Sequence, residues 1–119
     1  MPNYFDREAD RLYCSHCGEG TLDEDFIQWL NAVRHEFGKP MVVSSGYRCP
    51  KHPIEYRKSK PGAHSTGRAV DIRVMGEDVI ELTAIAYKHG CRRVGWNQKG
   101  SARFVHLDRA DMPNGSWSY

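Results

Sequence analysis

The chain has 119 residues, of which 39% are hydrophobic and 27% are charged, and its formal net charge is +2. This composition is typical of an ordinary globular protein, and the length predicts a single domain over residues 1–119. The slight charge, with no run of basic residues, argues against nucleic acid as a partner, and no apolar stretch approaches the length of a membrane span.

The N-terminal segment, residues 1–14, lacks the basic start and apolar middle of a secretory signal peptide. We therefore expect synthesis in the cytoplasm without a signal peptide, and reduced thiols. Cys14-x-x-Cys17 could form a four-thiolate structural zinc site with Cys49 and Cys91. Alternatively, Cys91 begins an apolar strand and is simply a small buried residue.

Apolar residues recur at helical spacing through the next segment and predict a core helix over roughly 23–37. Thr21 and Glu24 are spaced as a capping box at its start, and Gly38 ends it. The following segment, MVVSSGYR (41–48), is typical of a strand that runs into a turn.

The segment 49–64 is rich in proline and lysine, without periodicity, and predicts a long loop. Long loops in compact domains are often functional. A second amphipathic helix is predicted between Gly76 and Gly90. Two strands, 91–96 and 103–108, follow it and are joined by a short turn containing glycine, so they predict a hairpin. These elements indicate an α+β fold with an antiparallel sheet packed against helices.

A strand predicted over 69–74 carries a carboxylate opposite a core face. Its residues 70, 72 and 74 are apolar and face one side, whereas Asp71 faces the other. Aspartate is rare in strands and is seldom buried without a partner. His106 occupies the equivalent position in the strand 103–108.

His64, Asp71 and His106 together form a set of two imidazoles and one carboxylate. Three protein ligands with an open fourth position are a common catalytic zinc arrangement. If the three share one ion, the chain between His64 and Asp71 has to turn back, and Ser65-Thr66-Gly67 is suited to that turn. The remaining histidines have no supporting pattern and are interpreted as ordinary structural or surface residues: His16, His35, His52 and His89.

Three motifs occur in a recognisable order: SSGYRCP (44–50), HSTGRAVDI (64–72) and FVHLD (104–108). Their order and separations resemble those of the zinc D-alanyl-D-alanine carboxypeptidase family. That family includes phage endolysin L-alanyl-D-glutamate peptidases, murein endopeptidases and vancomycin-resistance dipeptidases, and it shares its fold with Hedgehog signalling domains. The N-terminal YCSHCGEG is also similar to the phage-type members, so the resemblance covers most of the chain.

The resemblance implies a Hedgehog/DD-peptidase-like fold and zinc bound by His64, Asp71 and His106. It also implies that Arg48 orients a substrate carboxylate or carbonyl, or stabilises a developing oxyanion. The alternative for Arg48 is a structural salt bridge that holds the long loop in place.

Further residues could contact the substrate or shape its groove. Ser65 either donates a hydrogen bond to a ligand or to substrate, or only forms the turn. The aromatic residues Tyr47, Tyr56, Trp96 and Trp117 could line a groove for peptide or sugar. The tail, residues 111–119, is interpreted as a mobile or crossing segment from which Trp117 folds back.

The chain departs from the family pattern at one position. Many members carry an acidic general base three residues before the last zinc-binding histidine, and Arg103 stands there. Asp108 is then the candidate base, taking a proton from water and delivering it to the leaving amine. Alternatively, Asp108 is a carboxylate that orients the imidazole of His106.

These features predict a zinc metallopeptidase that hydrolyses an amide bond in bacterial peptidoglycan peptides, as a phage endolysin or a murein endopeptidase or carboxypeptidase. We expect a monomer that acts on the cell wall after release during host lysis, or as part of a phage virion. The alternative, which the Arg103 departure favours, is a non-catalytic zinc-binding domain in virion assembly or protein recognition.

Overall fold

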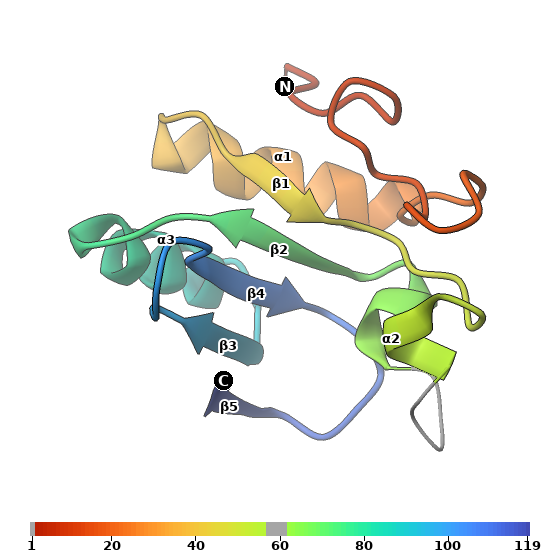
Figure 1. Cartoon of the computed structure of the whole chain (residues 1–119). Helices are drawn as coiled ribbons and strands as arrows, with labels where there is room; N and C mark the ends of the chain where they lie inside the picture. The colour runs from red at the N-terminus through yellow and green to blue at the C-terminus, as the bar shows by residue number, and fades with distance from the viewer. Residues whose placement is uncertain (1, 57–61) are drawn as a thin grey trace.

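The computed structural model describes residues 2–56 and 62–119, so part of the predicted loop, residues 57–61, lies outside the described residues. The strands are β1 (Val42–Ser45), β2 (Ala69–Arg73), β3 (Arg93–Asn97), β4 (Phe104–Asp108) and β5 (Gly115–Ser118). The helices are α1 (Glu24–Phe37), α2 (Pro53–Tyr56), the 3-10 helix η1 (Ala63–Thr66) and α3 (Glu77–Lys88). The described strands form a five-stranded sheet in the order β1-β2-β4-β3-β5 (Figure 1). The predicted α+β class is confirmed.

The sheet is antiparallel except for its last pair, β3 and β5, which run parallel. Its register aligns one residue from each strand in a single row. Asp71 pairs with Ser45 on one side and with His106 on the other. Gly95 pairs with His106 and with Trp117. Because paired residues direct their side chains to the same face, this row gathers the polar side chains of the predicted site.

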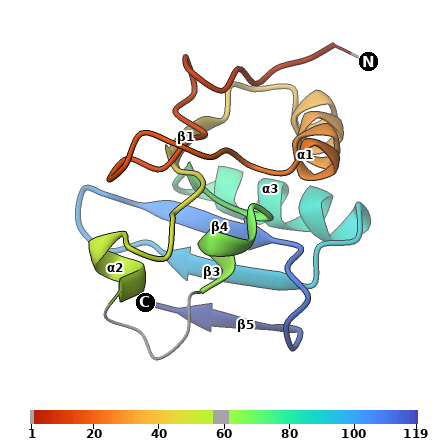
Figure 2. The ribbon, with the colours of Figure 1, turned by 90° about the vertical axis from the view of Figure 1, so that its right-hand side faces the viewer.

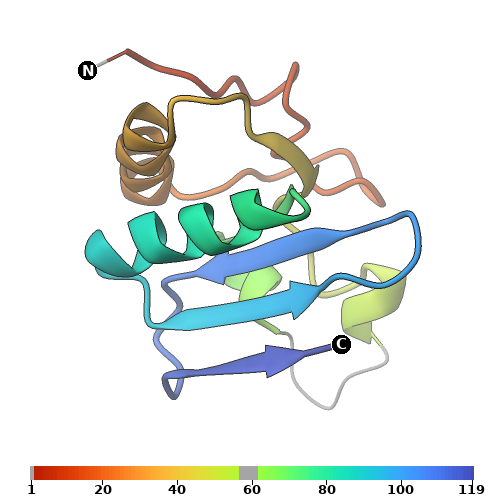
Figure 3. The same cartoon turned by 90° about the vertical axis from the view of Figure 1, so that its left-hand side faces the viewer.

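Two helices, α1 and α3, cover one face of the sheet (Figure 3). The alternation predicted for 69–74 is confirmed, since Val70 and Ile72 are fully buried in this core. Other fully buried members of the core include Leu30, Val33, Leu82, Val105 and Leu107. Within the described chain, no helix has the length and apolar character that a membrane crossing requires.

The start of α1 differs from the prediction. The N-cap residue is Asp23, so the capping box predicted for Thr21 and Glu24 is wrong. A tertiary contact explains the difference: the backbone N–H of Asp23 donates to the carbonyl of Gly67 at 2.8 Å. This contact fixes where the chain enters the helix. At the other end, Gly38 adopts the left-handed conformation and ends the helix as predicted.

The predicted loop and the predicted tail both contain regular structure. The loop 49–64 includes the short helix α2 and the start of η1, which lie at one end of the sheet (Figure 2). The tail 111–119 adds β5 to the edge of the sheet, and its Trp117 folds back against His106. The sequence pattern does not predict α2 or β5, because each is only four residues long and β5 is largely exposed.

Packing of α3 against the sheet predicts a sharp contrast between two substitutions on that helix. Leu82 is fully buried, whereas the side chain of Ile80 is 73% exposed. Leu82→Ala is expected to lower the free energy of unfolding by about 2–5 kcal/mol, because it leaves a cavity. Ile80→Ala should change it by about 0.5 kcal/mol or less. Urea unfolding measures both, and equal effects would contradict this packing.

Candidate metal centre

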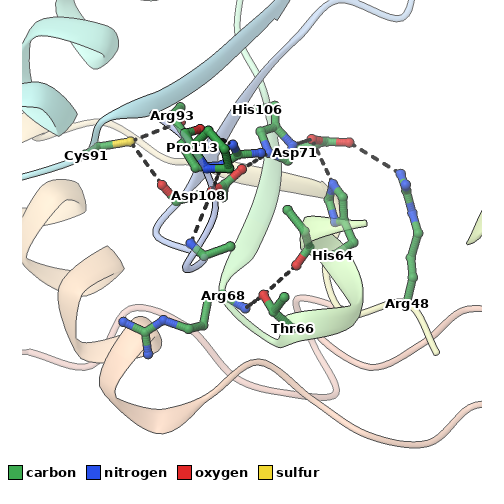
Figure 4. Close-up of polar contacts among 12 residues, drawn as sticks. Arg48, His64, Thr66, Arg68, Asp71, Cys91, Arg93, His106, Asp108 and Pro113 are labelled. Atoms are coloured by element: carbon green, nitrogen blue, oxygen red, sulfur yellow. Dashed lines mark hydrogen bonds and ion pairs between the residues drawn. The ribbon is translucent and has the colours of Figure 1, made fainter. Parts of the chain in front are cut away.

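The three residues predicted as metal ligands come together in the structure (Figure 4). His64 lies on η1, Asp71 on β2 and His106 on β4, and all three are buried. Asp71 Oδ1 is 3.3 Å from His64 Nε2 and 2.9 Å from His106 Nδ1. One ligand atom from each residue lies within 4.8 Å of the others. This cluster, here called the triad, is compact enough to hold one metal ion.

The turn predicted between His64 and Asp71 brings His64 back over the sheet. The chain makes the single turn of η1, and Gly67 follows it in the left-handed conformation with a φ of 77°. Thr66 closes the turn by donating from Oγ1 to the carbonyl of Ala63 at 2.6 Å. The predicted reversal at residues 65–67 is confirmed.

Hydrogen bonds outside the triad determine which nitrogen of each imidazole carries a proton. His64 Nδ1 lies 2.7 Å from the carbonyl of Gly46, which can only accept, so this nitrogen donates. His106 Nε2 lies 2.6 Å from Asp108 Oδ2 and donates to that carboxylate. In the neutral imidazoles, His64 Nε2 and His106 Nδ1 therefore carry no proton, and each directs its lone pair toward Asp71.

With both rings neutral, the triad presents three electron-rich atoms to one another, and their repulsion is relieved by a metal cation or by an added proton on His106, whose Nδ1 lies 2.9 Å from Asp71 Oδ1. Burial alone would raise the pKa of Asp71, but the contacts with His106 and His64 hold it well below its usual range. Burial lowers the pKa of His106, but the carboxylates of Asp108 and Asp71 outweigh it and raise that pKa. Two imidazole nitrogens with one carboxylate oxygen are a donor set that suits zinc. The residues present therefore fit a zinc ion.

Asp108 lies behind His106 and is completely buried. One of its oxygens accepts from His106, and the other accepts from Arg93 Nε at 2.6 Å and from the backbone N–H of Ala110 at 3.1 Å. Burial raises the pKa of Asp108, but hydrogen bonds from His106 and Arg93 lower it below its usual range. Both oxygens of this carboxylate are thus engaged in holding the imidazole and the strand end.

Arg48 reaches the triad from the loop after β1. Its guanidinium lies 3.6 Å from Asp71 Oδ2 and 3.2 Å from Glu55 Oε2, and its Nε donates to Ser45 Oγ at 3.1 Å. Glu55 is buried and also accepts from the backbone N–H of Gly62 at 2.5 Å. The sequence analysis missed Glu55, because it sits in a predicted loop with no pattern to mark it. These salt bridges agree with the alternative interpretation, in which Arg48 holds the loop in place, and they also put its cation beside the triad.

A family model described as Peptidase M15 matches residues 4–108, which include η1, β2 and β4. The chain belongs to the Peptidase M15 family. The family is one of metallopeptidases, and the buried triad fits the metal site that such an enzyme needs. The resemblance to a zinc peptidase family is therefore confirmed. A search of curated proteins gave no match.

In this M15 peptidase, the other predicted substrate residues have structural contacts. Ser65 Oγ donates to the backbone carbonyl of Arg48 at 2.6 Å, so it holds the loop that carries the guanidinium. The ring of Tyr47 packs closely on Gly20, and a Cβ added at Gly20 would lie 2.5 Å from that ring. It also lines a groove of about 580 Å³ along β1, whose described lining includes no member of the triad.

The aromatic residues of the sheet divide between the core and the triad. Trp96 Nε1 donates to Thr83 Oγ1 at 3.2 Å and joins the core side. The ring of Trp117 lies 5.2 Å from that of His106. Gly95 permits this approach, because a Cβ at that position would lie 2.4 Å from Trp117 Nε1. Trp117 is therefore the aromatic side chain that covers one flank of the triad.

Two further predictions concern Arg103 and the cysteines. Arg103, at the position of the usual general base, donates from Nε to the carbonyl of Gly100 at 2.9 Å. The four-thiolate zinc site is wrong, because the buried thiol of Cys91 contacts the carbonyls of Arg93 and Asp108. The alternative, that Cys91 is a small buried residue, is confirmed.

The hydrogen bond between Asp108 and His106 predicts that this carboxylate controls metal affinity. Asp108→Asn is expected to weaken zinc binding at the triad about 10–100-fold, because the imidazole loses its charged acceptor. Asp111→Asn, at an exposed position nearby, is the matched control and should bind zinc as the parent does. Competition with a chromophoric chelator measures both affinities, and an unchanged affinity in Asp108→Asn would contradict the assignment.

Proposed function

We propose that this protein is a zinc peptidase that hydrolyses an amide bond in the peptides of bacterial peptidoglycan. The proposal is carried by one observation: three buried acceptor atoms, from His64, Asp71 and His106, converge with their protons already committed elsewhere. Two imidazole nitrogens and one carboxylate oxygen at this spacing form a donor set that suits zinc. When bound, zinc supplies a Lewis acid that polarises a carbonyl and activates water.

In this proposal, Arg48 binds the substrate. Its guanidinium lies beside the triad and its side chain is 14% exposed, so the N–H groups that Ser45 and Glu55 do not accept can donate to a carbonyl or carboxylate of the peptide. The buried carboxylate of Glu55, 3.2 Å from one guanidinium nitrogen, fixes the orientation of the group. Ser65 holds the same residue from its backbone side. Glu55 and Ser65 are therefore positioning residues.

Asp108 is also assigned a positioning role, in preference to that of general base. Its two oxygens are occupied by His106, Arg93 and a backbone N–H, and the side chain is fully buried. A general base has to reach the water whose proton it takes. A carboxylate in these contacts instead keeps the proton of His106 on Nε2 and its lone pair on Nδ1.

Peptidoglycan as substrate is supported by the resemblance of the motifs to peptidases of that class and by membership of the Peptidase M15 family. The N-terminal similarity to phage-type members supports action on the host cell wall, either after release as an endolysin or from a virion. Peptidoglycan peptides contain carboxylate-bearing residues, which suit the cationic Arg48.

A second candidate is a zinc-binding domain without catalysis, in virion assembly or protein recognition. The observation that favours it is Arg103, which replaces the acid that many members use as base. Under this alternative the triad would bind zinc equally well, so metal content alone does not separate the two candidates.

Digestion of purified peptidoglycan separates them. We expect zinc-loaded protein to release defined muropeptides, with the release abolished by a chelator and by His106→Ala but not by His35→Ala, a histidine outside the triad. Mass analysis of the fragments identifies the bond that is cut. No release from several wall types by protein that retains zinc in the triad would favour the non-catalytic candidate, and cleavage of casein instead would indicate a general protease.

A further inference from the structure

A second cluster of metal-binding side chains lies outside the triad. Cys14, Cys17 and Cys49 each offer a sulfur, and the three sulfurs lie within 4.8 Å of one another. The Sγ atoms of Cys14 and Cys49 are 3.5 Å apart. Two sulfurs bound to one tetrahedral zinc, each at about 2.3 Å, are separated by about 3.8 Å. The spacing of the thiols is therefore close to that of a zinc-thiolate site.

The segment that carries Cys14 and Cys17 is folded as a tight turn. The backbone N–H of Gly18 donates to the carbonyl of Cys14 at 2.8 Å, and Gly18 takes a φ of 73° that favours glycine. Burial raises the pKa of Cys14, but backbone N–H groups of Cys49, Cys17 and His16 directed at its sulfur lower it to about 7. These N–H groups stabilise the thiolate, the form that binds metal.

The charge of the surroundings also suits an anionic site. Zinc with three thiolates and a neutral fourth ligand carries a net negative charge. Arg7 lies over the same turn, where its guanidinium donates to the carbonyls of Gly18 and Gly20 at 3.3 and 3.0 Å. Its position places a cation at the turn. Cys17 is exposed, so an ion can reach the cluster from solvent.

The spacing favours His52 as a fourth ligand. Cys49-x-x-His52 repeats the spacing of Cys14-x-x-Cys17, and paired motifs of this kind are typical of zinc sites. The N–H of His52 donates to the carbonyl of Cys49 at 2.9 Å, and its Nε2 lies 3.3 Å from the hydroxyl of Ser15. The imidazole therefore already lies beside the turn of the first two cysteines.

We propose that Cys14, Cys17 and Cys49, with His52, bind a structural zinc ion at a second site, distinct from the triad. The site joins the N-terminal segment to the loop after β1. Because Arg48 directly precedes Cys49, the ion fixes the backbone of the residue that contacts Asp71. A disulfide between Cys14 and Cys49 is the rival arrangement, and it would leave the adjacent thiol of Cys17 without a function.

Metal content tests the second site independently of catalysis. Protein purified under argon is expected to carry two zinc ions per chain by elemental analysis. Cys17→Ser should carry one, whereas Cys91→Ala, the matched control at a core thiol, should keep both. His106→Ala should also lose one ion, but from the triad. Equal zinc content in the parent and Cys17→Ser would overturn the proposal, whatever the activity on peptidoglycan.

Cobalt substitution identifies which site each ion occupies. Thiolate ligands give cobalt a strong charge-transfer absorption in the near ultraviolet, and the triad has no sulfur. The band is expected in the parent and in His106→Ala, to be lost in Cys17→Ser, and to be weakened in His52→Ala but not in His16→Ala. Absence of the band in the parent, or a parent mass two daltons below the fully reduced value from a Cys14–Cys49 disulfide, would overturn the proposal.

Discussion

Two hydrogen bonds to groups outside the triad decide what the centre of this protein can bind. The carbonyl of Gly46 holds the proton of His64 on Nδ1, and the carboxylate of Asp108 holds the proton of His106 on Nε2. In the neutral rings, the remaining nitrogen of each then faces Asp71 as a lone-pair donor. In that form the buried triad suits a metal cation, so the rest of the fold can be understood as the support of a metal site.

The sheet supplies that support through its register. Asp71 and His106 are directly paired neighbours on β2 and β4, so their separation is fixed by backbone hydrogen bonds instead of by flexible side chains. His64 is added by a single 3-10 turn that Gly67 closes. On the far side, Gly95 leaves space for Trp117, which covers His106. Elements on both sides of the triad thus hold the ligands before any ion binds.

The sequence was most informative where a local pattern and the tertiary structure agree. The alternation of apolar and polar residues around Asp71 and around His106 predicted both strands. The polar face that each strand presents predicted that the two side chains would meet. The residues it missed depend on contacts far along the chain: Glu55 matters because Arg48 turns toward it, and α1 starts after Asp23 because of a bond to Gly67. No local pattern encodes such contacts, nor the parallel pairing of β5, which is short and exposed.

If the triad binds zinc, it does so through atoms already placed to receive the ion. Anomalous scattering from crystals of this chain, recorded on both sides of the zinc absorption edge, locates the ion. We expect a zinc peak among His64 Nε2, Asp71 Oδ1 and His106 Nδ1, with Asp108 still bonded to Nε2 of His106. Crystals grown with zinc that show no peak at the triad, or a peak on the other nitrogen of either ring, would contradict it.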